Sequence, residues 1–282
     1  MANESLNGAD LEQTSSLKGM RLHWMRAREN IDMRWADSSL MVCSFVCGLI
    51  DSVAFNAVSV FVSMQTGNTI FIALGSASLP VSQPTVWARA IVSVAAFWVG
   101  CWFFATGLRQ LGPRNKLTLF ASFFIQAALI FVSAAMAQTD VAPAFGYKNL
   151  DPLVPFDEEQ KLREEAHYSS YIVIALLAFQ SSGQITLSRS LGFNEVPTVV
   201  VTSLYCDLFS DPKLLDMPLR SNVKRNRRVL AVILLVAGGI LGGWLQRTSA
   251  GMPGALWLAA GLKLAMAISW LGWRSETVSG YV

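Results

Sequence analysis

The stretch Leu40–Leu79, LMVCSFVCGLIDSVAFNAVSVFVSMQTGNTIFIALGSASL, decides the fold of this 282-residue chain. It is a long apolar run that carries one acidic residue, Asp51, and one polar interruption, Gln65–Thr69. A carboxylate inside hydrocarbon is costly, so Asp51 needs either a partner or a function. A polar interruption of a membrane helix is tolerated only where protein or a water-filled cavity supplies hydrogen bonds. The stretch therefore predicts a membrane helix that is broken at a polar site.

The composition extends this prediction to the whole chain. Hydrophobic residues make up 53% of the sequence and charged residues 15%, whereas soluble domains contain about 25% charged residues. This composition predicts an all-α, multi-pass membrane protein with one helical domain, surrounded by the lipid bilayer. The net charge of +3 is divided unevenly between the loops and gives no indication of a nucleic-acid partner.

Apolar runs predict six transmembrane spans, each long enough to cross about 30 Å of hydrocarbon. The spans are expected at residues 39–62, 86–108, 117–137, 169–187, 229–246 and 254–273. They form a transmembrane domain over residues 38–275, between a polar, basic tail at 1–37 and a short tail at 276–282. An acidic loop at 138–167 separates the third span from the fourth.

Lysine and arginine lie mostly on one side of the predicted membrane. Sixteen of the 22 fall in the N-terminal tail, the 109–116 and 188–228 loops and the C-terminal tail, and five fall on the opposite side. The positive-inside rule therefore places both termini in the cytosol and the acidic loop outside. The sequence carries no visible address for an organelle, so the plasma membrane is the default location.

The two halves of the chain, about 39–137 and 168–273, share a plan. Each opens with a span that bears polar residues, continues with a short apolar piece near Thr66-Gly67 or Thr202-Ser203, and closes with two ordinary spans. Three spans per half would give the halves opposite orientations. Inverted repeats with a broken first helix place a transporter site where the breaks face each other at mid-membrane. The spacing differs between the halves, so a chance likeness of polar loops is the alternative.

Several motifs also carry a resemblance to a known family. They are Gly48-x-x-Asp51 with Met64-Gln65-Thr66-Gly67-Asn68-Thr69, the later Glu195-x-Pro197-Thr198-Val199-Val200-Val201-Thr202-Ser203, and the runs Phe179–Gln184 and Tyr205–Pro212. Over most of residues 40–273 the chain resembles the YoaK-like family of uncharacterised membrane proteins, its fungal members in particular. The resemblance implies about six helices and no established activity. Bacterial members often carry Thr-Gly-Thr where this chain has Thr202-Ser203-Leu204, so the second break is expected to be less polar here.

Two charged residues, Asp51 and Lys263, lie near the centres of the first and sixth predicted spans. An ion pair between them is the simplest interpretation, because each charge would offset the cost of burying the other. In the second interpretation Asp51 is a proton- or cation-coupling carboxylate or part of a substrate site. In the third, these two residues serve neither purpose.

Further polar residues complete the candidate substrate or coupling site. Thr66, Gly67, Asn68 and Thr69 offer hydroxyls, an amide and a permissive backbone, which suit a small polar ligand. They equally suit capping, with Asn68 or Thr69 as the N-cap of a helix that starts at about Ile70. The other candidates are neutral side chains that equally well form hydrogen bonds between helices, namely Asn56, Gln180, Gln184, Thr198 and Thr202.

Glycines in the fifth span predict a close helix crossing. Gly238, Gly239, Gly242 and Gly243 form two overlapping pairs at a spacing of four residues, which lets helix backbones approach. We expect this face to be used inside the protein rather than between copies, although a homo-oligomer stays open.

The sequence gives no support for a catalytic, metal or cofactor site. The four cysteines lie in or beside apolar segments, and neither His23 nor His167 lies in a span. The chain is therefore interpreted as a transporter or pore for an unidentified small solute, with proton coupling as an option. The alternatives are a non-transporting accessory or scaffold protein of a biosynthetic or stress pathway and, less favoured, a membrane-embedded enzyme.

Overall fold

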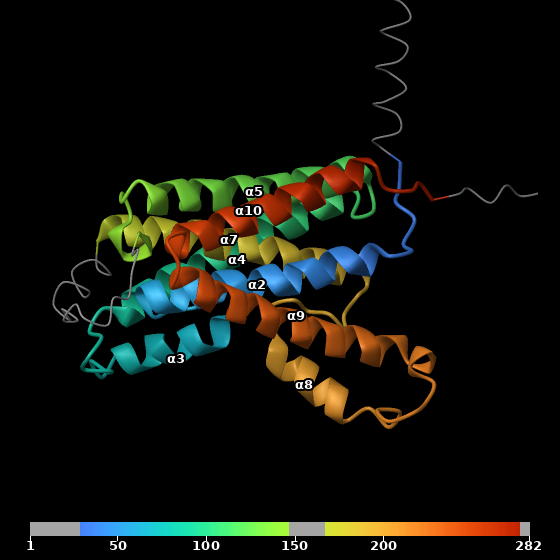
Figure 1. The fold of residues 1–282 in the computed structure, drawn as a ribbon, viewed down its shortest axis with the longest axis horizontal. Helices are drawn as coiled ribbons and strands as arrows, with labels where there is room; N and C mark the ends of the chain where they lie inside the picture. Colours follow the sequence, from blue (N-terminus) through green and yellow to red (C-terminus); the bar gives the residue numbers. More distant parts are fainter. Residues whose placement is uncertain (1–28, 147–166, 277–282) are drawn as a thin grey trace, which may run out of the picture.

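A computed structural model describes residues 29–146 and 167–276, and within these ranges the chain is helical (Figure 1). The long helices are α2 (Ala36–Val58), α4 (Val86–Leu111), α5 (Lys116–Gln138), α7 (Tyr168–Leu191), α9 (Val223–Gln246) and α10 (Gly251–Leu271). The short helices are α3 (Gln65–Gly75), α8 (Val201–Phe209), η1 (Pro143–Phe145) and η2 (Leu219–Ser221). The predicted tails and the acidic loop fall largely on residues 1–28, 147–166 and 277–282, outside the described residues.

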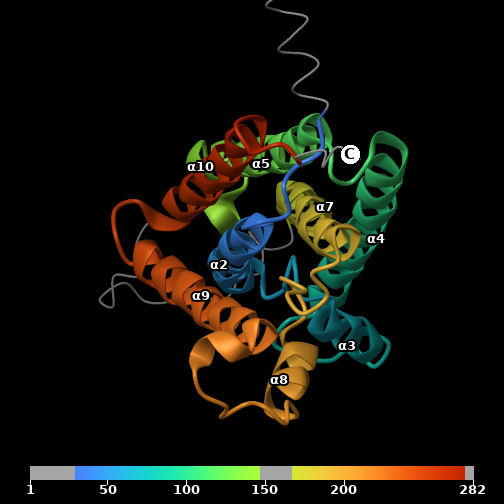
Figure 2. The same cartoon turned by 90° about the vertical axis from the view of Figure 1, so that its right-hand side faces the viewer.

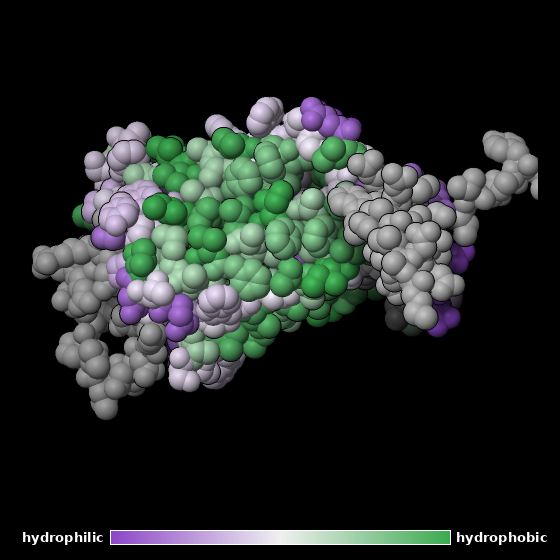
Figure 3. Space-filling model, turned by 90° about the horizontal axis from the view of Figure 1, so that it is seen from above, coloured by the Kyte–Doolittle hydropathy of each residue, from purple (hydrophilic) through white to green (hydrophobic). Residues whose placement is uncertain are grey.

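The six long helices confirm the six predicted spans, since each is long and apolar enough to cross a membrane. Figure 3 shows a broad hydrophobic surface over the middle of the molecule, with hydrophilic residues gathered toward its ends. The end where α2 begins and α10 ends is called the near end here, and the opposite end the far end; the near end is on the right in Figure 1.

The two most buried spans, α2 and α7, occupy the centre of the bundle (Figure 2). Helix α2 packs on α9, α7 packs on α4, and α5 packs on α10. Buried apolar residues form two clusters along this arrangement. One spans the far half of α2 with α7 and α10, and the other gathers around Trp270, Phe123 and Leu40 nearer the near end.

Glycines allow a close backbone approach at two helix crossings. A Cβ on Gly238 of α9 would overlap the carbonyl oxygen of Phe45 in α2, and a Cβ on Gly48 of α2 would overlap the carbonyl oxygen of Leu235 in α9. A Cβ on Gly100 of α4 would in turn stand 2.6 Å from the carbonyl oxygen of Phe179 in α7. The α9 glycine face is therefore used inside the protein at Gly238, as expected.

The short helices α3 and α8 each begin in the middle of the bundle and run to one of its ends. After α2 the backbone turns at Ser59, with φ 58°, and returns to the level of Asp51 before α3 begins. Helix α3 then reaches the far end, where Gly75 packs on Trp87 at the start of α4. Helix α8 runs in the opposite sense, to the near end. Figures 1 and 2 show α3 and α8 on the same side of the bundle.

The depths of these half-helices follow from their neighbours. Asp51 lies 15 residues into α2, which is about 22 Å from the near end at about 1.5 Å per residue. The segment that precedes α8 lines a hollow with Ser44 of α2 and Leu235 of α9. By the same rise Ser44 lies about 12 Å from the near end and Leu235 about 18 Å. Both first turns therefore lie near the middle of the predicted membrane.

Candidate functional site

The first break, residues 59–64 between α2 and α3, is held by Asp51. Its Oδ1 accepts the backbone N–H groups of Val62 at 2.9 Å and Ser63 at 3.0 Å. Its Oδ2 accepts the hydroxyl of Ser63 and faces the thiol of Cys47 at 3.9 Å. Asp51 is 4% exposed, and it satisfies backbone donors that a break inside a membrane would otherwise leave unpaired.

Asn68 performs the same task from the other side of the break. Its amide oxygen accepts the N–H of Phe61 at 3.1 Å, and its amide nitrogen donates to the carbonyl oxygen of Phe61 at 2.6 Å and to the hydroxyl of Ser93 at 3.1 Å. The predicted capping role was wrong, because α3 begins at Gln65 rather than Ile70 and Asn68 lies within it. The predicted interruption Gln65–Thr69 is thus the first turn and a half of α3, and the true break precedes it.

The first turn of α3 carries no side-chain cap. Its N-cap residue, Met64, donates and accepts no capping hydrogen bond, and the N–H groups of residues 65–67 bond to none of the described residues. Thr66 is exposed beside them, and Gly67 packs on the ring of Phe61. Thr69 is exposed and donates to the carbonyl oxygen of Gln65 at 2.9 Å, so its hydroxyl is used within its own helix.

The second break, residues 192–200 between α7 and α8, is built differently. Gly192 turns the chain with φ 82°, and the hydroxyl of Ser188 donates to the carbonyl oxygens of Phe193 at 2.9 Å and Val196 at 2.7 Å. Thr198 is 4% exposed and its hydroxyl has no hydrogen-bond partner in the described part of the chain. Thr202 is exposed in the first turn of α8, which also lacks a side-chain cap.

Lys263 lies in a separate polar cluster, and the predicted ion pair with Asp51 was wrong. Its ammonium group is fully buried and donates to the side-chain oxygens of Gln126 at 2.7 Å and Gln184 at 2.8 Å, with the sulfur of Cys43 at 3.5 Å. The two charged groups do not meet because they lie at different depths. Lys263 lies at the level of Cys43, which is eight residues before Asp51 on α2, or about 12 Å along the helix axis.

The other predicted residues serve contacts between helices. Asn56 donates to Gln246 of α9 at 2.7 Å. Gln184 is occupied through its oxygen by Lys263, whereas its amide nitrogen and the oxygen of Gln180 are buried and have no partner among the described residues. Ser181, which was not predicted, donates from α7 to the carbonyl oxygen of Val62 at 2.8 Å and so ties the first break to the second half.

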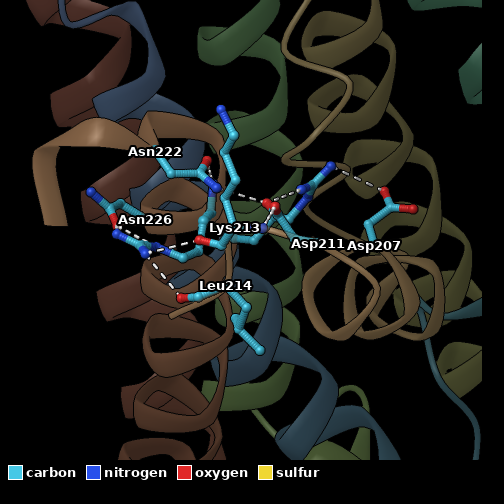
Figure 4. Close-up of polar contacts among 8 residues, drawn as sticks. Asp207, Asp211, Lys213, Leu214, Asn222 and Asn226 are labelled. Atoms are coloured by element: carbon cyan, nitrogen blue, oxygen red, sulfur yellow. Dashed lines mark hydrogen bonds and ion pairs between the residues drawn. The ribbon is translucent and has the colours of Figure 1, made fainter. Parts of the chain in front are cut away.

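Charged residues at the near end fix the second break and α8. Arg227 of α9 donates to Asp37 of α2 at 2.8 Å and to Glu195 in the second break at 2.8 Å. Asp207 and Asp211 both form ion pairs with Arg228, at 3.5 Å and 3.7 Å (Figure 4). The sequence analysis used these basic residues for the topology alone, and the two partners of Arg227, Asp37 and Glu195, lie too far away along the chain to be matched by a local pattern.

Asp211 is also the centre of a hydrogen-bond group in Figure 4. Its carboxylate accepts the amide of Asn222 at 2.8 Å and the N–H of Lys213 at 2.9 Å. These two hydrogen bonds, with the charges of Arg228 and Arg225, hold the pKa of Asp211 below its ordinary value. Arg225 closes the loop by donating to the carbonyl oxygens of Lys213 and Leu214, as Figure 4 also shows.

The structure thus brings the predicted residues together in three places rather than one. Asp51 and Asn68 secure the first break, Thr198 and Thr202 flank the start of α8, and Gln184 joins Lys263. Asn56 stands apart near the end of α2, where it donates to Gln246 of α9. Within residues 29–146 and 167–276, no group of three His, Cys, Asp or Glu side chains is placed to hold a metal ion.

Comparison with known proteins identifies the family. The family model described as "Protein of unknown function (DUF1275)" matches residues 39–269, which covers most of the chain and reaches from the first span into the sixth. No curated protein and no solved structure gave a significant match. The match confirms the resemblance carried by the motifs around Asp51 and Thr198. The chain therefore belongs to the DUF1275 family of multi-pass membrane proteins.

Proposed function

We propose that this protein is a transporter or pore for a small polar solute. The observation that carries the proposal is the pair of half-helices, α3 and α8, which begin near mid-depth and run to opposite ends. Neither first turn has a side-chain cap, and each presents an exposed threonine at its second residue, Thr66 or Thr202. Unpaired backbone donors at membrane depth are tolerated where they line a polar path.

The helix contacts support an inverted repeat of residues 39–137 and 168–273. The first span of each half packs on the second span of the other half, as α2 on α9 and α7 on α4, while the third spans, α5 and α10, pack on each other. Gly238 against Phe45 and Gly100 against Phe179 repeat one crossing in both halves. Inverted repeats with interrupted helices are a recurrent plan of secondary transporters, with the solute site at the repeat interface.

The same features favour transport over catalysis and over a scaffold role. His167 lies at the start of α7 and hydrogen-bonds Ser169, away from both breaks. Lys263, Asp51 and their partners lie in separate clusters, and the chemistry of a hydrolase or transferase site requires such groups to converge. A scaffold protein would need no paired half-helices with uncapped first turns. We place both termini in the cytosol and take the plasma membrane as the default location.

Proton coupling through Asp51 forms a separate part of this proposal. Both carboxylate oxygens accept hydrogen bonds from the first break. Protonation would weaken these charge-assisted bonds and loosen the segment that leads into α3. Protonation of Asp51 would therefore affect transport by shifting α3, and the carboxylate would not need to contact the solute.

Reconstituted vesicles test the transport function. Stopped-flow light scattering would follow the entry of urea, glycerol, potassium nitrate and potassium formate into vesicles with and without the protein. We expect faster entry of at least one solute, and a loss of about thirtyfold in the Thr66→Val/Thr202→Val double variant, because each of the two changes removes a polar contact worth about 1 kcal/mol. Thr186→Val is the matched control, since the Thr186 hydroxyl bonds only to carbonyl oxygens of its own helix.

Two outcomes would contradict the proposal. Equal entry of every solute with and without folded protein would favour the accessory or scaffold alternative. Entry that is unchanged in the double variant would place the path away from the half-helices.

A further inference from the structure

The loop between α8 and α9, residues 210–222, presents apolar side chains at the near end of the molecule (Figure 1). Two of them, the exposed apolar pair, are Leu215 at 89% and Met217 at 77% exposure. Leu215 is the most exposed large apolar side chain among the described residues. Phe209 at the end of α8 and Val223 at the start of α9 are also exposed. Exposed apolar side chains therefore follow the chain from one helix to the other.

The loop is held in place by its backbone. The side chain of Arg225 in α9 is buried and donates to the backbone carbonyl oxygens of Lys213 at 3.2 Å, Leu214 at 2.9 Å and Asp216 at 2.9 Å. These hydrogen bonds fix the backbone on either side of Leu215 against α9. The exposure of the apolar pair therefore belongs to a shaped part of the surface.

The structure divides the six basic residues of the segment 213–228 into two groups. Arg225, Arg227 and Arg228 bond to loop carbonyl oxygens or to acidic side chains. The other three, the exposed cations, form no ion pair with any described residue and are Lys213, Arg220 and Lys224. Figure 4 shows the side chain of Lys213 extending away from the hydrogen-bond group around Asp211. The second group is therefore available to bind an anion.

The loop lies at the depth of lipid headgroups. The outer apolar face of α9 begins with the exposed residues Val229 and Leu230. Lys224 precedes Val229 by five residues, which is about 8 Å along the helix axis. The headgroup region extends about 5 to 8 Å beyond the hydrocarbon on each side of a bilayer. Asp216 is the one acidic residue in the segment 212–224, so the charge presented to the headgroups is positive.

We propose that this loop binds anionic phospholipids at the membrane surface. The exposed apolar pair inserts among the upper parts of the acyl chains, and the exposed cations contact the headgroup phosphates. Long basic side chains reach headgroups in this way while their stems stay beside apolar groups. A free phosphate ion would need the cations alone, whereas the apolar pair beside them fits a lipid. The inference is independent of transport and of which end faces the cytosol.

Quenching by brominated lipids in reconstituted vesicles measures which lipid contacts the loop. A bimane fluorophore is attached through Ser221→Cys, at an exposed position between Arg220 and Lys224. Cys101→Ser and Cys206→Ser remove the native cysteines that are not buried. The vesicles contain phosphatidylcholine with phosphatidylglycerol as the minor lipid in both leaflets, and either lipid is brominated. We expect both to quench, with phosphatidylglycerol preferred about fivefold or more at equal density, since one cation near anionic lipid contributes about fivefold.

Two sets of substitutions separate the loop from the net charge of the near end. Glutamine at all three exposed cations should abolish the preference for phosphatidylglycerol. The matched control removes three exposed arginines beside α4, α5 and α10 at the same end and should keep the preference, with the substitutions Arg109→Gln, Arg114→Gln and Arg274→Gln.

A third variant tests insertion. Leu215→Ser/Met217→Ser should lower the quenching by both lipids, because the loop loses its contacts with hydrocarbon. Circular dichroism and size-exclusion chromatography of each variant establish that the chain is folded.

Several results would overturn the proposal. Quenching of the folded wild type by neither lipid would place the loop in water. Equal quenching by the two lipids, or a preference that survives glutamine at the exposed cations, would remove the selection for anionic lipid. Loss of the preference in the arginine control would assign it to the overall charge of the near end. Inorganic phosphate at constant ionic strength should leave the preference unchanged, and its loss there would indicate a site for the free ion.

Discussion

The carboxylate of Asp51 accepts both the backbone N–H and the hydroxyl of Ser63, twelve residues further along the chain. This relationship makes a charged residue part of the backbone hydrogen bonding of a membrane segment. An acid in the middle of an apolar helix is usually examined first as a functional group. Here it replaces the water that the first break would require.

A substitution series at Asp51 separates its acceptor role from its charge. Asparagine keeps an oxygen for the N–H groups of Val62 and Ser63, so we expect Asp51→Asn to cost about 1 kcal/mol of unfolding free energy. Asp51→Leu leaves both donors unpaired and should cost about 3 kcal/mol or more. Chemical unfolding in detergent measures both. Equal losses for the two variants would show that the charge, rather than the acceptor, stabilises the break.

Lys263 should be energetically independent of Asp51. The two residues share no hydrogen-bond partner and lie at different depths, so Asp51→Asn and Lys263→Met should be additive within about 0.5 kcal/mol in a double-mutant cycle. The pair Lys263→Met and Gln184→Leu should instead show coupling of about 1 kcal/mol or more, because Lys263 donates directly to Gln184. Recovery of stability in the Asp51→Asn/Lys263→Met double variant would restore the ion-pair interpretation.

The loop between α8 and α9 should respond to acid through Asp211. The pKa of Asp211 is held below its ordinary value by Asn222 and the N–H of Lys213. Its stabilising contribution is therefore complete above the ordinary pKa of about 3.9 and is lost as the pH falls through the lowered value. Asn222→Ser removes the amide donor and retains a hydroxyl that can cap α9, so the pKa of Asp211 should rise toward its ordinary value. A carboxyl-carbon NMR titration measures this shift, with Asn226→Ser as the control.

The sequence predicts the six spans because each span is a continuous run of apolar residues, whose length can be read directly from the sequence. It also predicts that residues near 65 and 200 interrupt the pattern, but it misplaces the break. The run Val60-Phe61-Val62 is apolar and was counted with the first span, although in the structure it is a non-helical segment that returns to Asp51. The apolar side chains themselves do not reveal that this segment leaves the helix, because its backbone groups bond to polar side chains elsewhere in the chain, among them Asp51 and Asn68.

Contacts between residues far apart in the sequence were the second feature that could not be predicted. Asp51 and Lys263 were matched by their positions within predicted spans, and an error of a few residues at the ends of α2 and α10 hid a difference in depth. The Arg227 contacts to Asp37 and Glu195 join segments that are far apart in the sequence, and no local pattern signals them. The α9 glycine face, by contrast, was predictable because its spacing is itself the requirement for close packing.

The α9 glycines provide a matched pair that tests this packing. A Cβ on Gly238 would overlap the carbonyl oxygen of Phe45, whereas a Cβ on Gly243 has no atom within 4 Å. Gly238→Ala should therefore separate α9 from α2 and cost about 3 kcal/mol or more, as overpacking against a backbone cannot be relieved by rotating a side chain. Gly243→Ala should be neutral or stabilise by up to about 1 kcal/mol, since alanine is the better helix former. Unfolding of the two variants in the same detergent, with size-exclusion chromatography, measures stability and assembly together. If Gly238→Ala keeps full stability but changes the oligomeric state, the glycine face serves contacts between copies, and the packing of α2 on α9 must tolerate a wider crossing.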